Sequence, residues 1–310
     1  MNVDDVKLDF DANGIFLVNA ILAAVMFGVA LDLKIRDFTA IAKKPKAPLV
    51  GLTAQLLLLP GFTYLLTLIM KPTPSIALGM ILVAACPSGN MSNFLTHLAR
   101  GNTALSVSVT AGSTVAALVF TPLNFSFWAG LNPATRAVVS ELNVSPFEVM
   151  STVLFVLGIP LAAGMLFARL LPAATQRLRK PLRYFSLGAF VLFLILAFAK
   201  NFDVFIQNGG PILVVVAIHN ATALCIGYFS AKIVRLEERD CRAVSIEVGI
   251  QNSALALALI FQFFGGMGGM ALVAGMWGIW HCVSGLTIAT IWSRRPYSQV
   301  ELPPLETEEA

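Results

Sequence analysis

Long runs of apolar residues fill most of this 310-residue chain, and short polar or charged stretches separate them. A helix needs about 20 mostly apolar residues to cross a bilayer. By that measure the pattern predicts nine spanning helices, at 13–32, 47–70, 75–99, 102–129, 146–171, 184–200, 210–231, 243–264 and 268–293. We therefore expect an all-α integral membrane protein with no soluble domain of any size.

The composition supports this fold class. Hydrophobic residues make up 57% of the chain and charged residues only 12%, and the mean hydropathy is +0.80. Soluble domains carry about 25% charged residues. Residues 1–12 are acidic and lack the basic start of a signal peptide, so we expect an extracytoplasmic amino-terminal segment. Residues 296–310 are acidic and contain proline, which predicts a disordered cytoplasmic tail.

The positive charges predict the orientation. If the amino terminus lies outside, the basic residues outside are Lys7, Lys71, Arg136 and Lys200, which leaves 17 of the 21 lysines and arginines inside. Cytoplasmic loops of membrane proteins carry such an excess. We expect nine helices with the carboxyl terminus in the cytoplasm. The basic residues are scattered over loops, so the pattern does not favour nucleic-acid binding.

Two predicted spans contain small and polar residues near their middles. Residues 86–93 of the third span read CPSGNMSN, and residues 247–253 of the eighth read EVGIQNS. An unpaired backbone or carboxylate at that depth costs several kcal/mol, so such breaks persist only inside protein or a water-filled cavity. In the predicted topology these two spans are antiparallel, as in transporters built from inverted repeats. We expect two broken helices that cross, one in each repeat.

The repeats are expected to be unequal. The first covers 13–135 with four helices and lacks one, and the second covers 136–295 with five. An odd number of spans follows from this difference.

Glu247 is the main candidate for chemistry, because it lies within an apolar segment. A buried carboxylate must be protonated, paired with a basic group or bound to a cation. A structural ion pair with Arg242, five residues earlier, is one alternative. Cation binding is favoured, because unwinding of the helix near residue 249 would free the carbonyls of Val248 and Ile250. Oxygen ligands of this kind suit a hard cation.

Further oxygen ligands are available from both halves of the chain. Gln251 adds an amide beside the second break, and Gln55 is a polar residue deep in the second helix. Ser92 and Asn93 follow the first break, where they would also serve as helix caps. Hydroxyls recur with helical spacing on one face of the next helix, although such groups often bond to their own helix. Those hydroxyls belong to Ser106, Thr110 and Ser113.

An anionic substrate is expected next to the breaks. The half-helices that begin near Asn90 and Asn252 would point partial positive charge at the middle of the membrane. His281, in the last span, is a third candidate for substrate contact, although a lone membrane histidine is more often a packing residue. Two rival functions stay open: a proton-coupled carrier that uses Glu247, and an intramembrane enzyme that uses Cys86 or Glu247 with His281.

At these residues the chain resembles the bile acid:sodium symporter family. The motifs that carry the resemblance are 86–93, 98–102 (LARGN) and 247–253. The resemblance implies one sodium site formed by Ser92, Asn93, Ser106, Thr110 and Glu247. It implies a second sodium site formed by Glu247, Gln251, Gln55 and the carbonyls of Val248 and Ile250.

The resemblance also implies a mechanism. A core that contains the crossing would move against a panel of helices, which we assign to predicted spans 1, 5 and 6. Ser88 and Cys282 depart from the family pattern and leave the substrate open. We expect a monomeric, non-enzymatic sodium-coupled symporter in a bacterial inner (plasma) membrane. It would import an organic anion such as a bile acid, pantoate or a similar carboxylate or sulfonate together with two sodium ions.

Overall fold

The computed structural model describes residues 4, 20, 23–24, 26–28, 30–31, 39, 41–89, 91–141, 146–200 and 202–295. Within these residues the chain is helical, and its only extended pairing is an isolated antiparallel bridge between Ser88 and Gln251. Most of the first predicted span, the two terminal segments and Asn90 lie outside the described residues.

The helices are α3 (Lys46–Thr53), η2 (Ala54–Leu58), α4 (Leu59–Met70), α5 (Pro74–Ala85), α6 (Met91–Leu98), α7 (Thr103–Leu131), α8 (Pro133–Glu141), α9 (Pro146–Val153), η3 (Leu154–Gly158), α10 (Ile159–Leu170), α11 (Pro172–Lys200), α12 (Phe202–Ile233), α13 (Glu238–Gly249), α14 (Ser253–Phe263) and α15 (Gly268–Ser293). The segments η2 and η3 are π-helical and continue directly into α4 and α10.

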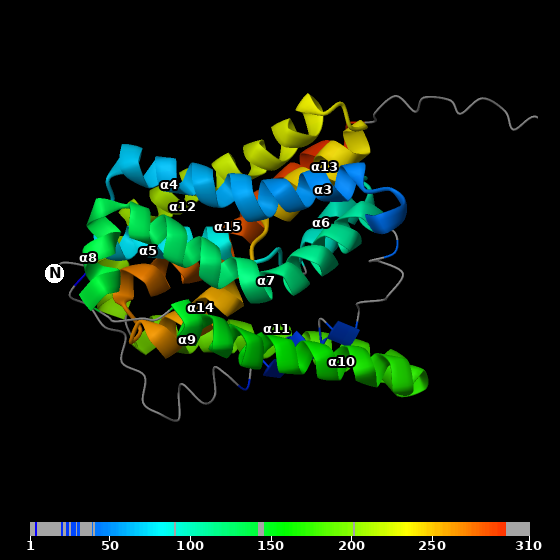
Figure 1. Ribbon diagram of the computed structural model, residues 1–310, viewed down its shortest axis with the longest axis horizontal. Coiled ribbons are helices and arrows are strands. Elements are labelled where there is room, and N and C mark those ends of the chain that lie inside the picture. The colour runs from blue at the N-terminus through cyan, green and yellow to red at the C-terminus, as the bar shows by residue number, and fades with distance from the viewer. Residues whose placement is uncertain are drawn as a thin grey trace, which may run out of the picture.

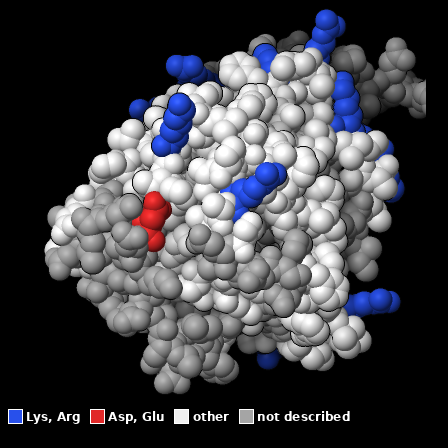
Figure 2. Space-filling view, turned by 60° about the vertical axis from the view of Figure 1, so that its left-hand side comes forward, with Lys and Arg blue, Asp and Glu red and all other residues white. Residues whose placement is uncertain are grey.

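Four described helical stretches are long and apolar enough to cross a membrane. They are Lys46–Met70, Thr103–Leu131, Gly209–Ile233 and Gly268–Ser293. Figure 2 shows a face on which uncharged residues cover most of the described surface, with lysine and arginine side chains singly or in small groups. Many large apolar side chains are exposed, among them Ile69, Phe147 and Ile233, and this suits contact with lipid. The protein is therefore an integral membrane protein with several spans.

Each predicted broken span consists of two helices. The third span is α5 followed by α6, and the eighth is α13 followed by α14. Every residue from Ser75 to Ala85 in α5 is buried, and so is every residue from Cys241 to Gly249 in α13. A helix that is covered on all sides lies in the interior. In Figure 1 these helices lie among α4, α7, α12 and α15, so the breaks lie deep in the molecule.

A second group of helices lies along one side of the molecule. Figure 1 shows α9, α10 and α11 (green) below the helices that surround the breaks, and α10 contacts α11. The described part of the first span joins this group, because Arg179 of α11 donates to the Leu31 carbonyl at 2.6 Å and Phe27 stacks edge-on with Phe167 of α10. The described part of span 1 thus contacts α10 and α11, the helices that contain predicted spans 5 and 6.

Several helix starts differ from the sequence prediction: α12 begins at Phe202 and not at 210, α13 begins at Glu238 and not at 243, and α8 lies between two predicted spans. The largest difference is at α11. The stretch from Pro172, which the sequence suggests is a loop before a span at 184–200, forms the first turns of α11. Proline is favourable at the first position of a helix, because its missing N–H has no partner there and its φ is already helical. An apolar-run criterion misses these turns because they are rich in basic residues.

Candidate ion and substrate site

The two broken helices meet at their breaks. The Gly89 N–H donates to the Ile250 carbonyl at 2.8 Å, and the Asn252 N–H donates to the Pro87 carbonyl at 2.9 Å. These bonds flank the antiparallel bridge between Ser88 and Gln251. The unwound backbones therefore satisfy one another at the centre of the molecule, which is what a buried break requires.

Glu247 lies beside this crossing and is fully buried. The Thr110 hydroxyl lies 2.9 Å from Oε2 and 3.1 Å from Oε1 of Glu247, and the Ser106 hydroxyl donates to Oε1. The Ser106 hydroxyl also lies 2.9 Å from Oδ1 of Asn93. Ser92 completes the group, with its hydroxyl 3.4 Å from that of Thr110. All five residues predicted for the first sodium site are in one cluster.

This cluster contains more acceptor oxygens than donor hydrogens. The hydroxyls of Ser106 and Thr110 carry one proton each, yet both lie near Glu247 and near Oδ1 of Asn93. Within the described residues, no group of three or more His, Cys, Asp and Glu residues gathers as a transition-metal site would require. One carboxylate among neutral oxygens is instead a ligand set for a hard cation.

The alternative ion pair between Arg242 and Glu247 is wrong. The Arg242 guanidinium pairs with Glu238, with 3.4 Å between Nε and Oε1. It also donates to the carbonyls of Ala99 and Trp292, both at 3.0 Å. One turn of α13 separates the two side chains, and they lie in different hydrogen-bond networks.

The residues predicted for a second site form an adjoining amide cluster. Gln55 donates through Nε2 to Oε1 of Gln251 at 2.8 Å and to the Cys86 carbonyl at 3.0 Å. Gln251 donates through Nε2 to the Val248 carbonyl at 2.6 Å. The Ile250 carbonyl is not free, because it accepts from the Gly89 N–H at the crossing. After the helix unwinds, the Val248 carbonyl therefore accepts from a side-chain amide and the Ile250 carbonyl from a backbone N–H.

Gln55 reaches the crossing from the π-helical segment η2. Pro60 lies two residues after this segment and has no N–H to give to the carbonyl of residue 56. Asn124 of α7 donates to that Leu56 carbonyl at 2.8 Å instead. Wide turns of this kind are common at functional sites, because they re-aim side chains.

Asn220 is a site residue that the sequence analysis missed. Its Nδ2 donates to the Gly249 carbonyl at 2.8 Å, and its Oδ1 accepts from the Ser284 hydroxyl at 2.6 Å. It links the second break to α12 and α15 much as Gln55 links the first break to η2. The available signal was a side-chain amide in the middle of the apolar run 210–231. Ser88 was noted only as a departure from the family, yet its hydroxyl lies 3.3 Å from the Ile250 carbonyl.

Asn220→Ala should destabilise the second break. The change leaves the Gly249 carbonyl without its donor, and an unpaired buried carbonyl costs about 1–3 kcal/mol. We expect a lower thermal unfolding temperature for the purified variant in detergent. The matched control is Thr222→Val in the same helix, since among the described residues the Thr222 hydroxyl bonds only the Ile218 carbonyl of its own helix. Equal unfolding temperatures for the two variants would contradict this role for Asn220.

Two of the three residues predicted to contact substrate are described. Asn252 caps α14, where its Oδ1 accepts from the Leu255 N–H at 3.1 Å. His281 of α15 is buried, and its Nδ1 has no hydrogen-bond partner among the described residues. The Asn252 oxygen is thus used as a helix cap, and the His281 Nδ1 is buried without a partner in the part of the chain that the structure describes. The structure does not bring these groups into hydrogen-bond contact with each other.

Comparisons with known proteins agree on one family. The family model described as "Sodium Bile acid symporter family" matches residues 20–208. The "Uncharacterized sodium-dependent transporter YocS" of Bacillus subtilis is 32% identical over 90% of this chain and 83% of its own length. "Probable sodium/metabolite cotransporter BASS1, chloroplastic" of Arabidopsis thaliana is 27% identical over 90% of this chain and 67% of its own length.

These names are those of transporters, so the chain belongs to a transport family and not to an enzyme family, and the rival intramembrane enzyme is not retained. The P3 protein of Homo sapiens is also similar, with 34% identity over 76% of this chain and 48% of its own length. The match of more than half the chain to one family model confirms the resemblance seen in the motifs. The chain belongs to the sodium bile acid symporter family.

Proposed function

We propose that this protein is a sodium-coupled symporter that imports an organic anion by alternating access. The observation that carries the proposal is the buried Glu247 carboxylate, which lies among hydroxyl and amide oxygens beside two crossed helix breaks. The printed names of the two relatives, a sodium-dependent transporter and a sodium/metabolite cotransporter, support sodium as the coupling ion.

Two sodium ions are proposed to bind at the crossing. The first would be held by Ser92, Asn93, Ser106, Thr110 and Glu247. The second would be held by Glu247, Gln55, Gln251 and the carbonyls of Val248 and Ile250. Binding at the second position requires the amides of Gln55 and Gln251 to turn their oxygens toward the ion, since each now donates to the other. Sodium and the amide pair therefore compete for the same oxygens.

An inverted repeat is proposed for the helices around the breaks. The second half-helices of the two broken spans, α6 and α14, start 162 residues apart (253 − 91). Nearly the same spacing separates the starts of α5 and α13 (238 − 74 = 164) and of α7 and α15 (268 − 103 = 165). A constant spacing over three helix pairs supports repeats at 13–135 and 136–295 within nine spans.

The proposed setting is a bacterial inner membrane, with the amino terminus outside, the carboxyl terminus in the cytoplasm and the protein a monomer in lipid. The contacts among spans 1, 5 and 6 support a panel against which the core moves. The core would carry both breaks. Alternating access then requires sliding between the two groups of helices and leaves the crossing intact.

The number of sodium ions per cycle sets the highest ratio of internal to external substrate concentration that the protein can reach. Each sodium that moves down a tenfold gradient releases about 1.4 kcal/mol. One net positive charge that moves across about 100 mV adds roughly 2.3 kcal/mol. Two sodium ions with a monoanion supply about 5 kcal/mol, which suffices for accumulation by roughly three to four orders of magnitude. One sodium ion would supply only about 1.4 kcal/mol.

The substrate is proposed to be a carboxylate or sulfonate, such as a bile acid or pantoate. The amino-terminal ends of α6 and α14 lie next to the crossing, and helix amino termini favour anions. Asn90, Asn252 and His281 are the proposed polar contacts. Ser88 and Cys282, which depart from the family pattern, would adjust which anion fits.

Uptake into proteoliposomes tests this function. A radiolabelled organic anion should enter only when sodium is outside, and an inside-negative potential should increase the rate, because two sodium ions with a monoanion carry net charge. Potassium at equal ionic strength is the control. Uptake that follows a pH gradient and ignores sodium would favour the proton-coupled carrier and overturn the proposal.

A further inference from the structure

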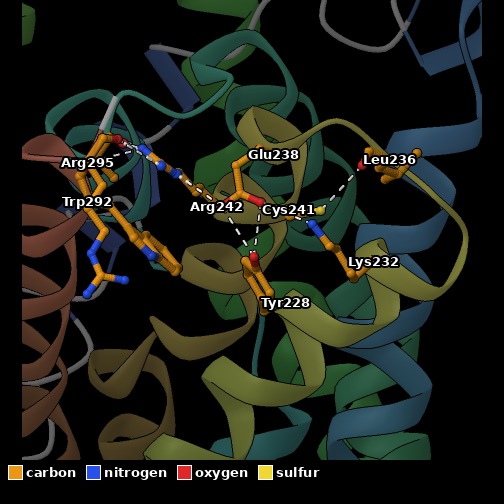
Figure 3. Close-up of polar contacts among 9 residues, drawn as sticks. Tyr228, Lys232, Leu236, Glu238, Cys241, Arg242, Trp292 and Arg295 are labelled. Carbon is orange, nitrogen blue, oxygen red and sulfur yellow. Dashed lines mark hydrogen bonds and ion pairs between the residues drawn. The ribbon is translucent and has the colours of Figure 1, made fainter. Parts of the chain in front are cut away.

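A polar cluster away from the crossing contains a buried arginine. Arg242 of α13 is 3% exposed. Its Nη1 donates to the carbonyls of Ala99 and Trp292, and its Nη2 donates to the Arg295 carbonyl at 3.2 Å. Figure 3 shows the guanidinium between the end of α15 and the Glu238 carboxylate. None of these residues belongs to the proposed sodium sites.

The acceptors of Arg242 lie at the carboxyl-terminal ends of two helices. Ala99 follows the last residue of α6, and Trp292 and Arg295 lie at the end of α15. Carbonyls in the last turn of a helix carry partial negative charge, and the Trp292 carbonyl accepts from Arg242 in addition to the Arg295 N–H. One guanidinium thus bonds the ends of α6 and α15 to α13. A lysine could not do the same, because its ammonium lacks the planar fork that reaches separate acceptors.

Other contacts fix the Arg242 side chain. Glu238, its ion-pair partner, accepts from the Tyr228 hydroxyl at 3.0 Å and lies 3.4 Å from the Lys232 ammonium. The guanidinium lies 5.8 Å from the centre of the Trp292 ring, and that ring stacks with Tyr228. These partners offset the cost of burying the charge and hold it in one position.

A second connection joins the same two parts of the chain. The Asn102 N–H donates to the Arg239 carbonyl at 3.0 Å, and its Nδ2 donates to Oδ1 of Asp240 at 2.8 Å. Asn102 also caps α7 through the Leu105 N–H. The turn between α6 and α7 is therefore bonded to the first turn of α13. The two helices with hydroxyl and amide ligands are attached to the helix that carries Glu247.

The bond between Arg242 and Ala99 joins α13 to the end of α6, a few residues from the ligand cluster in each segment. Arg242 precedes Glu247 by five residues, and Ala99 follows Asn93 by six. At about 1.5 Å of rise per residue, Arg242 and Ala99 each lie within about 9 Å of a residue of the ligand cluster, measured between backbone positions along the chain axis. Any slip of α6 along α13 would separate Asn93 from Ser106 and Glu247. That distance is short enough for one bond to set the register of the cluster.

We propose that Arg242 is a positioning residue for sodium binding, because it holds α6 against α13 and thereby fixes the distances within the first sodium site. The proposal rests on the proposed function. Arg242 touches neither ion nor substrate. Its effect passes through the backbones of α6 and α13.

The test is a sodium titration of the thermal unfolding temperature of the full chain, purified in detergent, with potassium keeping the ionic strength constant. Arg242→Gln should raise the sodium concentration for half-maximal stabilisation about tenfold, and Arg242→Lys should raise it less. The matched control is Arg294→Gln, which removes an exposed charge at the same end of α15. It should titrate like the wild type.

The outcomes separate the two proposals. In one outcome the wild type responds to sodium, and Arg242→Gln is half-maximally stabilised at the same sodium concentration as the wild type. Arg242 would then be merely structural, even if the sodium-free variant unfolds at a lower temperature, and its positioning role would be overturned. A wild type that ignores sodium would overturn the proposed function as well. If Arg242→Gln does not fold, Arg242→Lys and Asp240→Ala test the proposal in its place. Both should raise the sodium concentration for half-maximal stabilisation, and unchanged values in both would overturn the positioning role.

Discussion

Glu247→Gln is expected to abolish sodium-dependent uptake and to remove the stabilisation of the protein by sodium. Glutamine keeps the size and shape of the side chain and removes the charge that both proposed sodium sites share. Without a carboxylate, the hydroxyl and amide oxygens nearby are weak ligands for sodium. We expect uptake to fall on the order of a hundredfold or more, which corresponds to about 2.8 kcal/mol of lost binding.

The same change should raise the stability of the sodium-free protein. Glu247 is fully buried and has no basic partner among the residues that the structure describes. An ionised carboxylate in that situation destabilises the folded state. We therefore expect Glu247→Gln to unfold at the same or a higher temperature than the sodium-free wild type, and not to respond to added sodium. Glu237→Gln, an exposed change at the start of α13, is the control. A Glu247→Gln variant that still responds to sodium would exclude this carboxylate as a ligand.

The central part of the fold can be predicted from the sequence because burial in a membrane restricts polar residues so strongly. Polar residues within 86–93 and 247–253 could persist only where other parts of the chain satisfied them, and the crossing meets that requirement. Ser92 and Asn93 could be grouped with Glu247 for the same reason. Spacing alone then placed Ser106 and Thr110 on one helix face.

The partners of individual groups could not be predicted, because they depend on packing between distant segments. The sequence suggested that the Ile250 carbonyl would be free, but a hydrogen bond across the crossing occupies it. Proximity in sequence suggested an Arg242–Glu247 pair, but α6 and α15 supply carbonyls to that arginine. Asn220 has no neighbour in sequence that would indicate its bond to Gly249.

Gly89→Ala is expected to abolish transport for a geometric reason. A Cβ added at Gly89 would lie 2.9 Å from the backbone oxygen of Gln251 and 3.3 Å from its carbonyl carbon. Both atoms belong to the paired backbone of the crossing, so no side chain can rotate away. The two breaks would have to separate, and the Gly89 bond to the Ile250 carbonyl would lengthen or break. Forced overpacking of this kind costs about 1–3 kcal/mol.

Sodium binding should respond to Gly89→Ala more strongly than folding does. The helices α5 and α13 are buried along their length away from the crossing, whereas Asn93, Glu247 and Gln251 of the proposed sites lie next to the two breaks. We expect a folded variant whose uptake is at background and whose unfolding temperature is insensitive to sodium. Gly130→Ala, where an added Cβ meets no atom within 4 Å, is the matched control and should transport normally. Normal sodium-driven uptake by Gly89→Ala would mean that the close contact of the two breaks is not needed for coupling.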